Sequence, residues 1–133
     1  LMRNRILYPG TNSMLEVNLE RGESVKAESG AMVAMSSTID LDGKLEGGLM
    51  AGLGRMVAGE KFFFQTLTAT RGPGIAYLAP STPGDLVLLE LDGYTEYNVQ
   101  KDGFLAGADS IEINTKMQNL MQGFFSGEGF FVL

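Results

Sequence analysis

Among the residues of this chain that could do chemistry, two glutamates occupy equivalent places. Glu60 and Glu128 each follow a glycine, and each stands next to a segment rich in phenylalanine. A pair of carboxylates can act as general acid and base, or can bind a cation. The alternative is a polar residue at the joint between a helix and a strand. We favour that alternative for this candidate polar pair, because the sequence fixes no other acid, base or nucleophile nearby.

The chain contains neither cysteine nor histidine. These two absences exclude a disulfide framework, a Cys or His metal site, a Cys nucleophile and a Ser-His-Asp triad. We therefore assign no catalytic residue, no metal ligand and no cofactor-binding residue, and we expect a protein that is not an enzyme.

Two short motifs resemble ligand sites but do not complete them. Residues 40–43 (Asp-Leu-Asp-Gly) begin like an EF-hand loop, but such a loop needs a third carboxylate or amide two residues after Asp42 and its glycine after that, so Gly43 occupies the wrong place. We interpret this motif as a strand with outward-facing acids that ends in a turn. Residues 54–59 begin like a P-loop, but Glu60 follows where a phosphate-binding loop requires lysine.

The charge balance limits the possible partners. Ten Lys and Arg residues stand against 16 Asp and Glu residues, which gives a net charge of −6 and a pI near 4.5. An acidic chain with no basic run is a poor ligand for nucleic acid, because lysine and arginine provide the affinity for phosphate. No apolar stretch approaches the roughly 18 residues of a membrane span, and no secretory signal follows Arg3 and Arg5. We expect a cytoplasmic protein, since the lack of cysteine fits a reducing compartment.

The elements that would position any site are mostly strands. The chain has 133 residues and a mass of 14.3 kDa, which suits a single domain (1–133). Apolar and polar residues alternate with period two, and turn residues separate the runs. Strands are predicted at residues 15–19, 24–28, 32–35, 39–43, 62–70, 75–79, 86–91, 96–100, 103–106, 111–115 and 130–133. Strands at this spacing predict an all-β sandwich, barrel or β-helix roll.

Three turns are also predicted from residue type. Arg21-Gly22 separates the first two alternating runs, Pro83-Gly84 suits the centre of a type II turn, and Asp92-Gly93 is a hairpin signal.

Two segments instead follow helical spacing. Apolar residues recur along one face of residues 47–58 and of residues 115–124, which predicts two short amphipathic helices. Methionine-bearing faces of this kind either pack on the core or bind an adaptable partner. We take them as candidate interaction faces, and their members are Leu49, Leu53, Met56, Met117, Leu120 and Met121.

The two predicted helices occupy matching positions in an internal duplication. Each follows an alternating strand and leads to a Gly-Glu pair and an aromatic strand. The first repeat covers about residues 14–92, and the second covers about residues 96–133 and is incomplete. The last strand, 130–133, would be left as an open apolar edge. We therefore expect either a C-terminally truncated form or a second subunit that covers this edge.

Several of these segments resemble signatures of one known family. They are residues 15–25 (LEVNLERGESV), 28–33 (ESGAMV), 47–49 (GGL), 79–85 (APSTPGD) and 99–106 (VQKDGFLA). Together they resemble the altered-inheritance-of-mitochondria protein 24 family, long described as a domain of unknown function. The resemblance implies a double-stranded β-helix similar to that of the tryptophan RNA-binding attenuation protein. It implies no catalytic or cofactor residues, and RNA binding does not follow from a shared fold.

Three functions compete at this point. The first is a non-enzymatic, homo-oligomeric scaffold or binding protein that associates through sheet edges or helix faces with an unknown protein partner. The second is a small-ligand-binding protein, or a histidine-free enzyme, with a site in the mouth of the β-helix. The third is peripheral membrane contact, which only Arg55 and Lys116 near the helices would support. We favour the first.

Overall fold

The computed structural model describes residues 2–44 and 64–113, and these residues are mainly β. Eight strands form two four-stranded antiparallel sheets, and a single 3₁₀ turn, η1, spans Lys101–Gly103. The all-β prediction is thus confirmed for this part of the chain. The strands are β1 (Arg3–Leu7), β2 (Met14–Leu19), β3 (Ser24–Glu28), β4 (Met32–Met35), β5 (Ile39–Lys44), β6 (Phe64–Ala69), β7 (Gly74–Leu78) and β8 (Ala106–Ala108).

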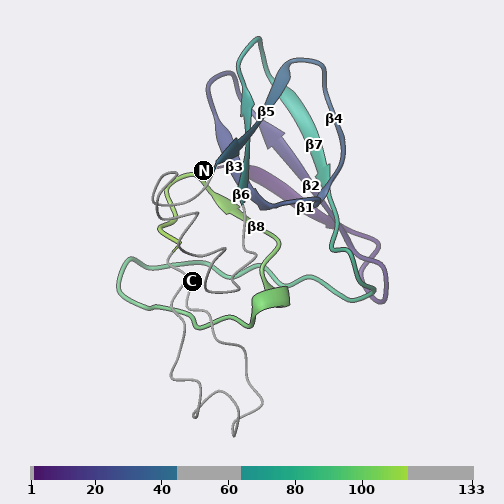
Figure 1. Cartoon of the computed structure of the whole chain (residues 1–133), viewed down its shortest axis with the longest axis vertical. Coiled ribbons are helices and arrows are strands. Elements are labelled where there is room, and N and C mark those ends of the chain that lie inside the picture. Colours follow the sequence, from purple (N-terminus) through teal and green to yellow (C-terminus); the bar gives the residue numbers. More distant parts are fainter. Residues whose placement is uncertain (1, 45–63, 114–133) are drawn as a thin grey trace, which may run out of the picture.

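The chain passes repeatedly from one sheet to the other (Figure 1). The first sheet has the strand order β1-β2-β7-β4, and the second has the order β5-β6-β3-β8. Consecutive strands such as β2 and β3 therefore lie in different sheets, and so do β6 and β7. The β2–β3 connection is the predicted Arg21-Gly22 turn, where Gly22 has a φ of +90° that a residue with a side chain rarely adopts.

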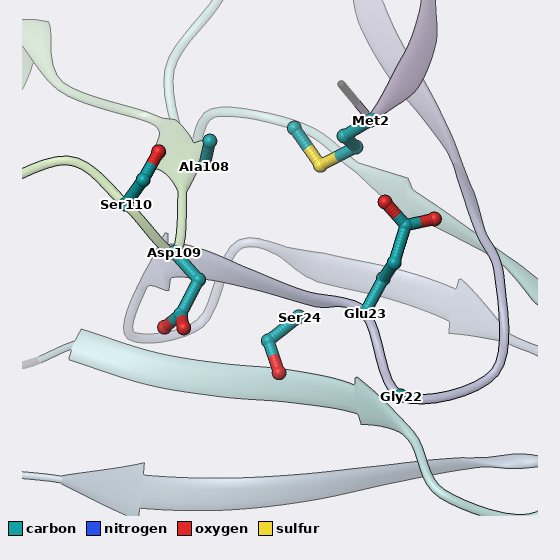
Figure 2. A pocket seen from close by; sticks show the side chains of 7 residues that line it. All are labelled: Met2, Gly22, Glu23, Ser24, Ala108, Asp109 and Ser110. Atoms are coloured by element: carbon teal, nitrogen blue, oxygen red, sulfur yellow. The ribbon is translucent and has the colours of Figure 1, made fainter.

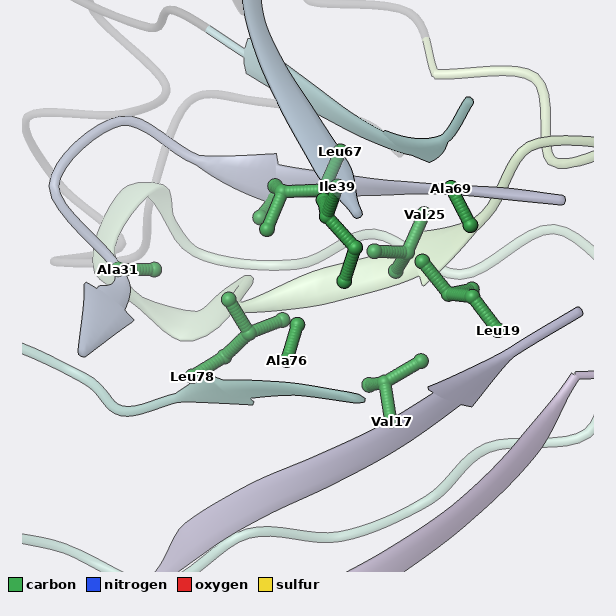
Figure 3. Close-up of a cluster of buried hydrophobic side chains, with 10 residues drawn as sticks. Val17, Leu19, Val25, Ala31, Ile39, Leu67, Ala69, Ala76 and Leu78 are labelled. Carbon is green, nitrogen blue, oxygen red and sulfur yellow. The ribbon is translucent and has the colours of Figure 1, made fainter. Parts of the chain in front are cut away.

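One aliphatic core fills the space between the sheets (Figure 3). The inward positions of β2 and β7 face those of β3 and β6, and the alternation along each strand decides which residues these are. Register places Val17 beside Ala76 in the first sheet and Val25 beside Leu67 in the second. The buried members are Val17, Leu19, Val25, Ala27, Ala31, Ile39, Leu67, Ala69, Ala76 and Leu78.

A smaller cluster covers the opposite face of the second sheet. Phe64 in β6 meets Phe104 edge to face, with ring centroids 5.6 Å apart, and Ile113 packs against the same cluster. On the same side, the Nζ of Lys26 donates a hydrogen bond to the carbonyl of Ile111 at 3.1 Å. Residues on either side of β8, namely Phe104 and residues 111–113, therefore cover part of this face.

Two strand predictions in the middle of the chain are wrong. Residues 86–91 and 96–100 belong to no strand. No backbone–backbone hydrogen bond joins residues 87–91 to any other described residue. An apolar β-forming composition favours an extended backbone, but a strand also needs a ladder partner, which local pattern cannot supply.

Three further predictions from the same part of the chain need correction. The strand expected at 103–106 is displaced to β8, which pairs with β3 at Ala106–Ala108. The described residues of the strand expected at 111–115 form no ladder, and Ile113 is buried by packing on Phe64 instead. Gly84 does not take the positive φ of a type II turn, because it forms a parallel bridge with Asn12, which requires an extended backbone.

Some predictions lie outside the described residues. They are both amphipathic helices (47–58 and 115–124), the final strand (130–133) and the repeat boundaries that depend on them. Conversely, the sequence did not predict β1, which pairs with β2 along its whole length. Its exposed positions are Arg3 and Arg5, so it lacks the apolar alternation that identified β2.

The core makes a direct prediction about stability. Leu67 is fully buried in β6, and we expect Leu67→Ala to lower the free energy of unfolding by about 2–5 kcal/mol, because it leaves a cavity between the sheets. Val87→Ala removes apolar carbon from a side chain that is 80% exposed, and we expect it to change stability by less than about 0.5 kcal/mol. Urea unfolding of both variants measures the difference, and equal losses would contradict this description of the core.

Candidate functional site

The site residues predicted from sequence all lie outside the described residues. They are the candidate interaction faces Leu49, Leu53, Met56, Met117, Leu120 and Met121, and the polar pair Glu60 and Glu128. Their roles therefore stay predictions. The described residues offer two other features that could serve a function: an open depression beside the β2–β3 turn and a long extended segment after β7.

The depression has a volume of about 390 Å³ and lies where the start of β3 meets the end of β8 (Figure 2). Its lining residues are Met2, Gly22, Glu23, Ser24, Ala108, Asp109 and Ser110. Figure 2 shows the carboxylate of Glu23 on the side of Met2 and that of Asp109 on the other side, so the two acids do not form a pair. Within residues 2–44 and 64–113, no three His, Cys, Asp or Glu side chains are grouped to hold a metal ion.

Two of the polar side chains that line the depression, Glu23 and Ser24, already have partners. Glu23 Oε1 accepts a hydrogen bond from the backbone N–H of Glu20 at 2.6 Å, and Ser24 Oγ lies 2.7 Å from Thr68 Oγ1. These contacts hold the β2–β3 turn and join β3 to β6. The depression therefore has neither a carboxylate pair for acid–base catalysis nor a ready set of cation ligands.

The second feature is the extended segment at residues 86–100, called the arm below. In Figure 1 the arm starts beside the β1–β2 loop, passes below the labelled strands to the left and turns back to η1. Its first half is strongly apolar, yet Val87, Leu88, Leu89 and Leu91 are 80%, 57%, 48% and 45% exposed. Tyr94, at its tip, is 94% exposed. Large contiguous apolar surfaces are rare on monomeric proteins, so the arm is a candidate interaction surface.

A turn at the tip of the arm is already formed. Asp92 Oδ1 accepts hydrogen bonds from the N–H groups of Tyr94 at 2.8 Å and Thr95 at 2.7 Å, and Gly93 has a φ of +86°. These backbone hydrogen bonds, and one from the Thr95 hydroxyl, hold the pKa of Asp92 below its usual value. A turn therefore forms at Asp92-Gly93, but the hairpin that this dipeptide predicted is wrong, because the flanking residues form no strands.

A latch fastens the root of the arm to the β1–β2 loop. Ser13, only 2% exposed, donates its hydroxyl to Asp85 Oδ1 at 2.5 Å. The backbone N–H of Ser13 donates to the carbonyl of Gly84 at 3.2 Å, which adds a parallel bridge beside the side-chain contact. The Ser13 hydroxyl, with the backbone N–H groups of Gly10 and Leu86, lowers the pKa of Asp85.

The motif that begins like a calcium loop has a structural role instead. Asp40 in β5 accepts hydrogen bonds from the Thr70 hydroxyl and from the Arg71 guanidinium, the latter at 2.6 Å. The Thr70 contact first, and then Arg71, lower the pKa of Asp40. Both carboxylate oxygens are thus occupied by the β6–β7 turn, which confirms an outward acid on a strand. The turn expected at Gly43 is wrong, because β5 continues to Lys44 and Gly43 pairs with Gln65.

The profile of a family described as "Mitochondrial biogenesis AIM24" matches residues 4–133. The chain belongs to this family. The resemblance predicted from residues 15–106 is therefore confirmed.

Two streptococcal proteins are similar to this AIM24 chain over almost its whole length. An uncharacterized protein of Streptococcus pyogenes serotype M6 is 35% identical over 140 residues, which cover 97% of this chain and 56% of that protein. A crystal structure of a Streptococcus pyogenes protein, solved by structural genomics, is 33% identical and superposes with a TM-score of 0.76. The superposition covers 99% of this chain and 59% of the chain in the crystal structure.

These AIM24 relatives carry no stated activity that could be transferred. The chain spans less than two thirds of the length of each of them. Among the described residues, none forms a helix with the length and hydropathy needed to cross a bilayer.

Two functional features were missed from sequence, for different reasons. The latch joins Ser13 and Asp85, which are 72 residues apart, and no local pattern connects them. The arm was predicted as strands, and its apolar character was already visible in the sequence. Residues 86–91 contain five aliphatic side chains and a single acid, Glu90, a pattern typical of a buried strand.

The lowered pKa of Asp85 predicts a pH-dependent latch. The ionised carboxylate is favoured in the folded state, so its contribution is complete above the unfolded value of 3.8 and is lost as the pH falls through the lower folded value. We expect Asp85→Asn to lower the Tm at pH 7, and we expect this difference from the unmodified chain to shrink below about pH 4.

Thermal unfolding between pH 7 and pH 2.5 tests the latch. Asp102→Asn serves as the control because it removes one exposed acid outside this contact. A Tm difference for Asp85→Asn that stays constant over the whole pH range would contradict the role given to the ionised carboxylate.

Proposed function

We propose that this chain is a non-enzymatic, oligomeric binding or scaffold protein that associates with further copies of itself. The observation that carries the proposal is the arm, an apolar extended segment that lies outside the core of the two sheets. Binding of the arm would remove several aliphatic side chains from water, and each one fully buried contributes about 1.5–3 kcal/mol.

The unpaired backbone of the arm supports the same function. Residues 87–91 make no backbone–backbone hydrogen bond with another described residue, so within that part of the chain their N–H and C=O groups have no ladder partner. Addition of a strand to a sheet edge is a common way for proteins to assemble, because the ladder gives affinity and the side chains give specificity. The preformed Asp92 turn and the Ser13 latch hold the two ends of this segment before any partner arrives.

The proposal also includes the fold, the absence of enzymatic activity and the location of the protein. We propose the double-stranded β-helix, similar to that of the tryptophan RNA-binding attenuation protein, as the arrangement of the two sheets. Their antiparallel pairing around one core is compatible with it. We propose no enzymatic activity and no nucleic-acid partner, since the net charge is −6 and histidine and cysteine are lacking. A cytoplasmic location fits a chain without cysteine.

The alternative, a small-ligand-binding protein or histidine-free enzyme, has weaker support. The volume of the depression, about 390 Å³, is within the range of ligand pockets. However, ligand sites are mostly apolar hollows with a few convergent polar groups, whereas Glu23 and Ser24 at this depression are already engaged within the protein. We therefore place self-association first.

Self-association predicts the mass of the protein in solution. We expect light scattering coupled to size-exclusion chromatography to give one defined multiple of 14.3 kDa at micromolar concentration. The mass should fall on dilution if the contact is reversible. A mass of 14.3 kDa at every concentration up to about 1 mM would contradict the proposed function.

A further inference from the structure

We infer that the apolar half of the arm, residues 86–91, adds as a strand to the outer edge of β1 in a second copy of this chain. This inference rests on the proposed function and names the surface on which the arm binds. It is carried by three features of the described residues: the unpaired arm, the nature of the available sheet edges, and the distribution of charge between them.

The arm has the character of a strand that lacks only a partner. It is six residues long, aliphatic at five positions and extended, and its side chains are exposed on both sides. Segments of this length and composition pair readily with a free strand edge. The length of β1, five residues at Arg3–Leu7, matches this segment.

Among the outer strands in the described part of the chain, β1 is the most suitable acceptor. The outer strands are β1 and β4 in the first sheet, and β5 and β8 in the second. β4 is interrupted by a register shift between Met32 and Ala34, and β8 has only three residues. β5 carries Asp40, an exposed acid that would repel an acidic arm. β1 is regular along its whole pairing with β2 and is the one whose charged residues are all basic.

Charge complementarity favours the same pairing. Between residues 79 and 100 the chain contains four acids (Asp85, Glu90, Asp92 and Glu96) and neither lysine nor arginine. β1 contributes Arg3 and Arg5, whose side chains are 74% and 68% exposed. Opposite charges on neighbouring strands stabilise a pair, and they exclude a register that opposes acid to acid.

The present ion pairs of these arginines do not prevent the contact. Arg3 lies 3.2 Å from Glu20, and Arg5 lies 3.3 Å from Glu16. The Arg3–Glu20 pair is exposed at both residues and contributes little to stability. In the Arg5–Glu16 pair only the guanidinium is exposed, because the Glu16 side chain is 13% exposed. A guanidinium has five N–H donors, so each arginine can hold a second carboxylate without losing the first.

This contact would join two different surfaces of the same chain. Each copy presents both an arm and a β1 edge, so the contact is heterologous: it closes into a ring if the rotation allows, and otherwise continues as a filament. A pairing of two arms would instead bring two acidic segments together, which the charges disfavour.

Charge reversal tests the pairing directly. We expect Arg5→Glu to weaken self-association about tenfold, since it opposes acid to acid, and Glu90→Lys to do the same. The double variant, Arg5→Glu with Glu90→Lys, should return to within about threefold of the unmodified chain. Glu112→Lys makes the same charge change as Glu90→Lys at an exposed residue outside both segments, and it should leave assembly unchanged.

Proline substitution tests the backbone ladder. Neighbouring residues of a strand direct their N–H groups to opposite edges, so either Leu88→Pro or Leu89→Pro must remove a ladder hydrogen bond. We expect at least one of them to reduce self-association more than the matched Leu88→Ala or Leu89→Ala. The fold of the monomer should not change, because the arm makes no ladder among the described residues.

The outcomes separate this inference from the proposed function. If the protein assembles but neither charge reversal nor proline alters its mass, the arm does not bind β1, and self-association uses another surface. If each charge reversal weakens assembly but the double variant does not recover, the two residues do not face each other, and the inference is wrong. If the unmodified chain is a monomer at every concentration, both proposals fail.

Discussion

Burial of aliphatic side chains between the two sheets is the constraint on which the rest of the described structure depends. Alternation along β2, β3, β6 and β7 directs one set of side chains into this core, and Val17, Val25 and Leu67 are completely buried there. The chain has no cysteine and therefore no disulfide. Among the described residues, no three His, Cys, Asp or Glu side chains are grouped to hold a metal ion. Burial of apolar side chains is the main stabilising contribution in such a structure. The exposed ion pairs on the outer strands add little.

The arm is the segment that this core cannot accommodate. The inward faces of both sheets are already filled, and the opposite face of the second sheet is covered by Phe104 and Ile113. Four aliphatic side chains of the arm are exposed instead. The latch at Ser13 and the turn at Asp92 hold the ends of this segment by hydrogen bonds.

The sequence predicted the positions of the core strands more successfully than the pairing between strands. Period-two alternation located β2 and β3 because one face of each strand is buried, and burial is what creates the pattern. It failed for β1, an outer strand whose exposed positions are Arg3 and Arg5. It also failed for residues 86–91, where the composition is that of a strand but no ladder forms in the described part of the chain. Pairing is a property of the whole fold, so local pattern cannot decide it.

The candidate site shows the same division between local and long-range information. The Asp92-Gly93 turn was predicted because its hydrogen bonds join residues within three positions of one another. The contact between Ser13 and Asp85 spans 72 positions and could be found only in the folded chain. The apolar character of the arm was visible in the sequence, but its exposure was not.

The most direct test of the arm as an unpaired strand is hydrogen–deuterium exchange at its amides as a function of protein concentration. Self-association through the arm predicts that the amides of residues 87–91 exchange rapidly in dilute protein and become protected as the concentration rises. The amides of β6 should be protected throughout, which provides an internal reference. Rapid exchange at residues 87–91 at every concentration, with assembly present, would contradict a role for the arm in that assembly.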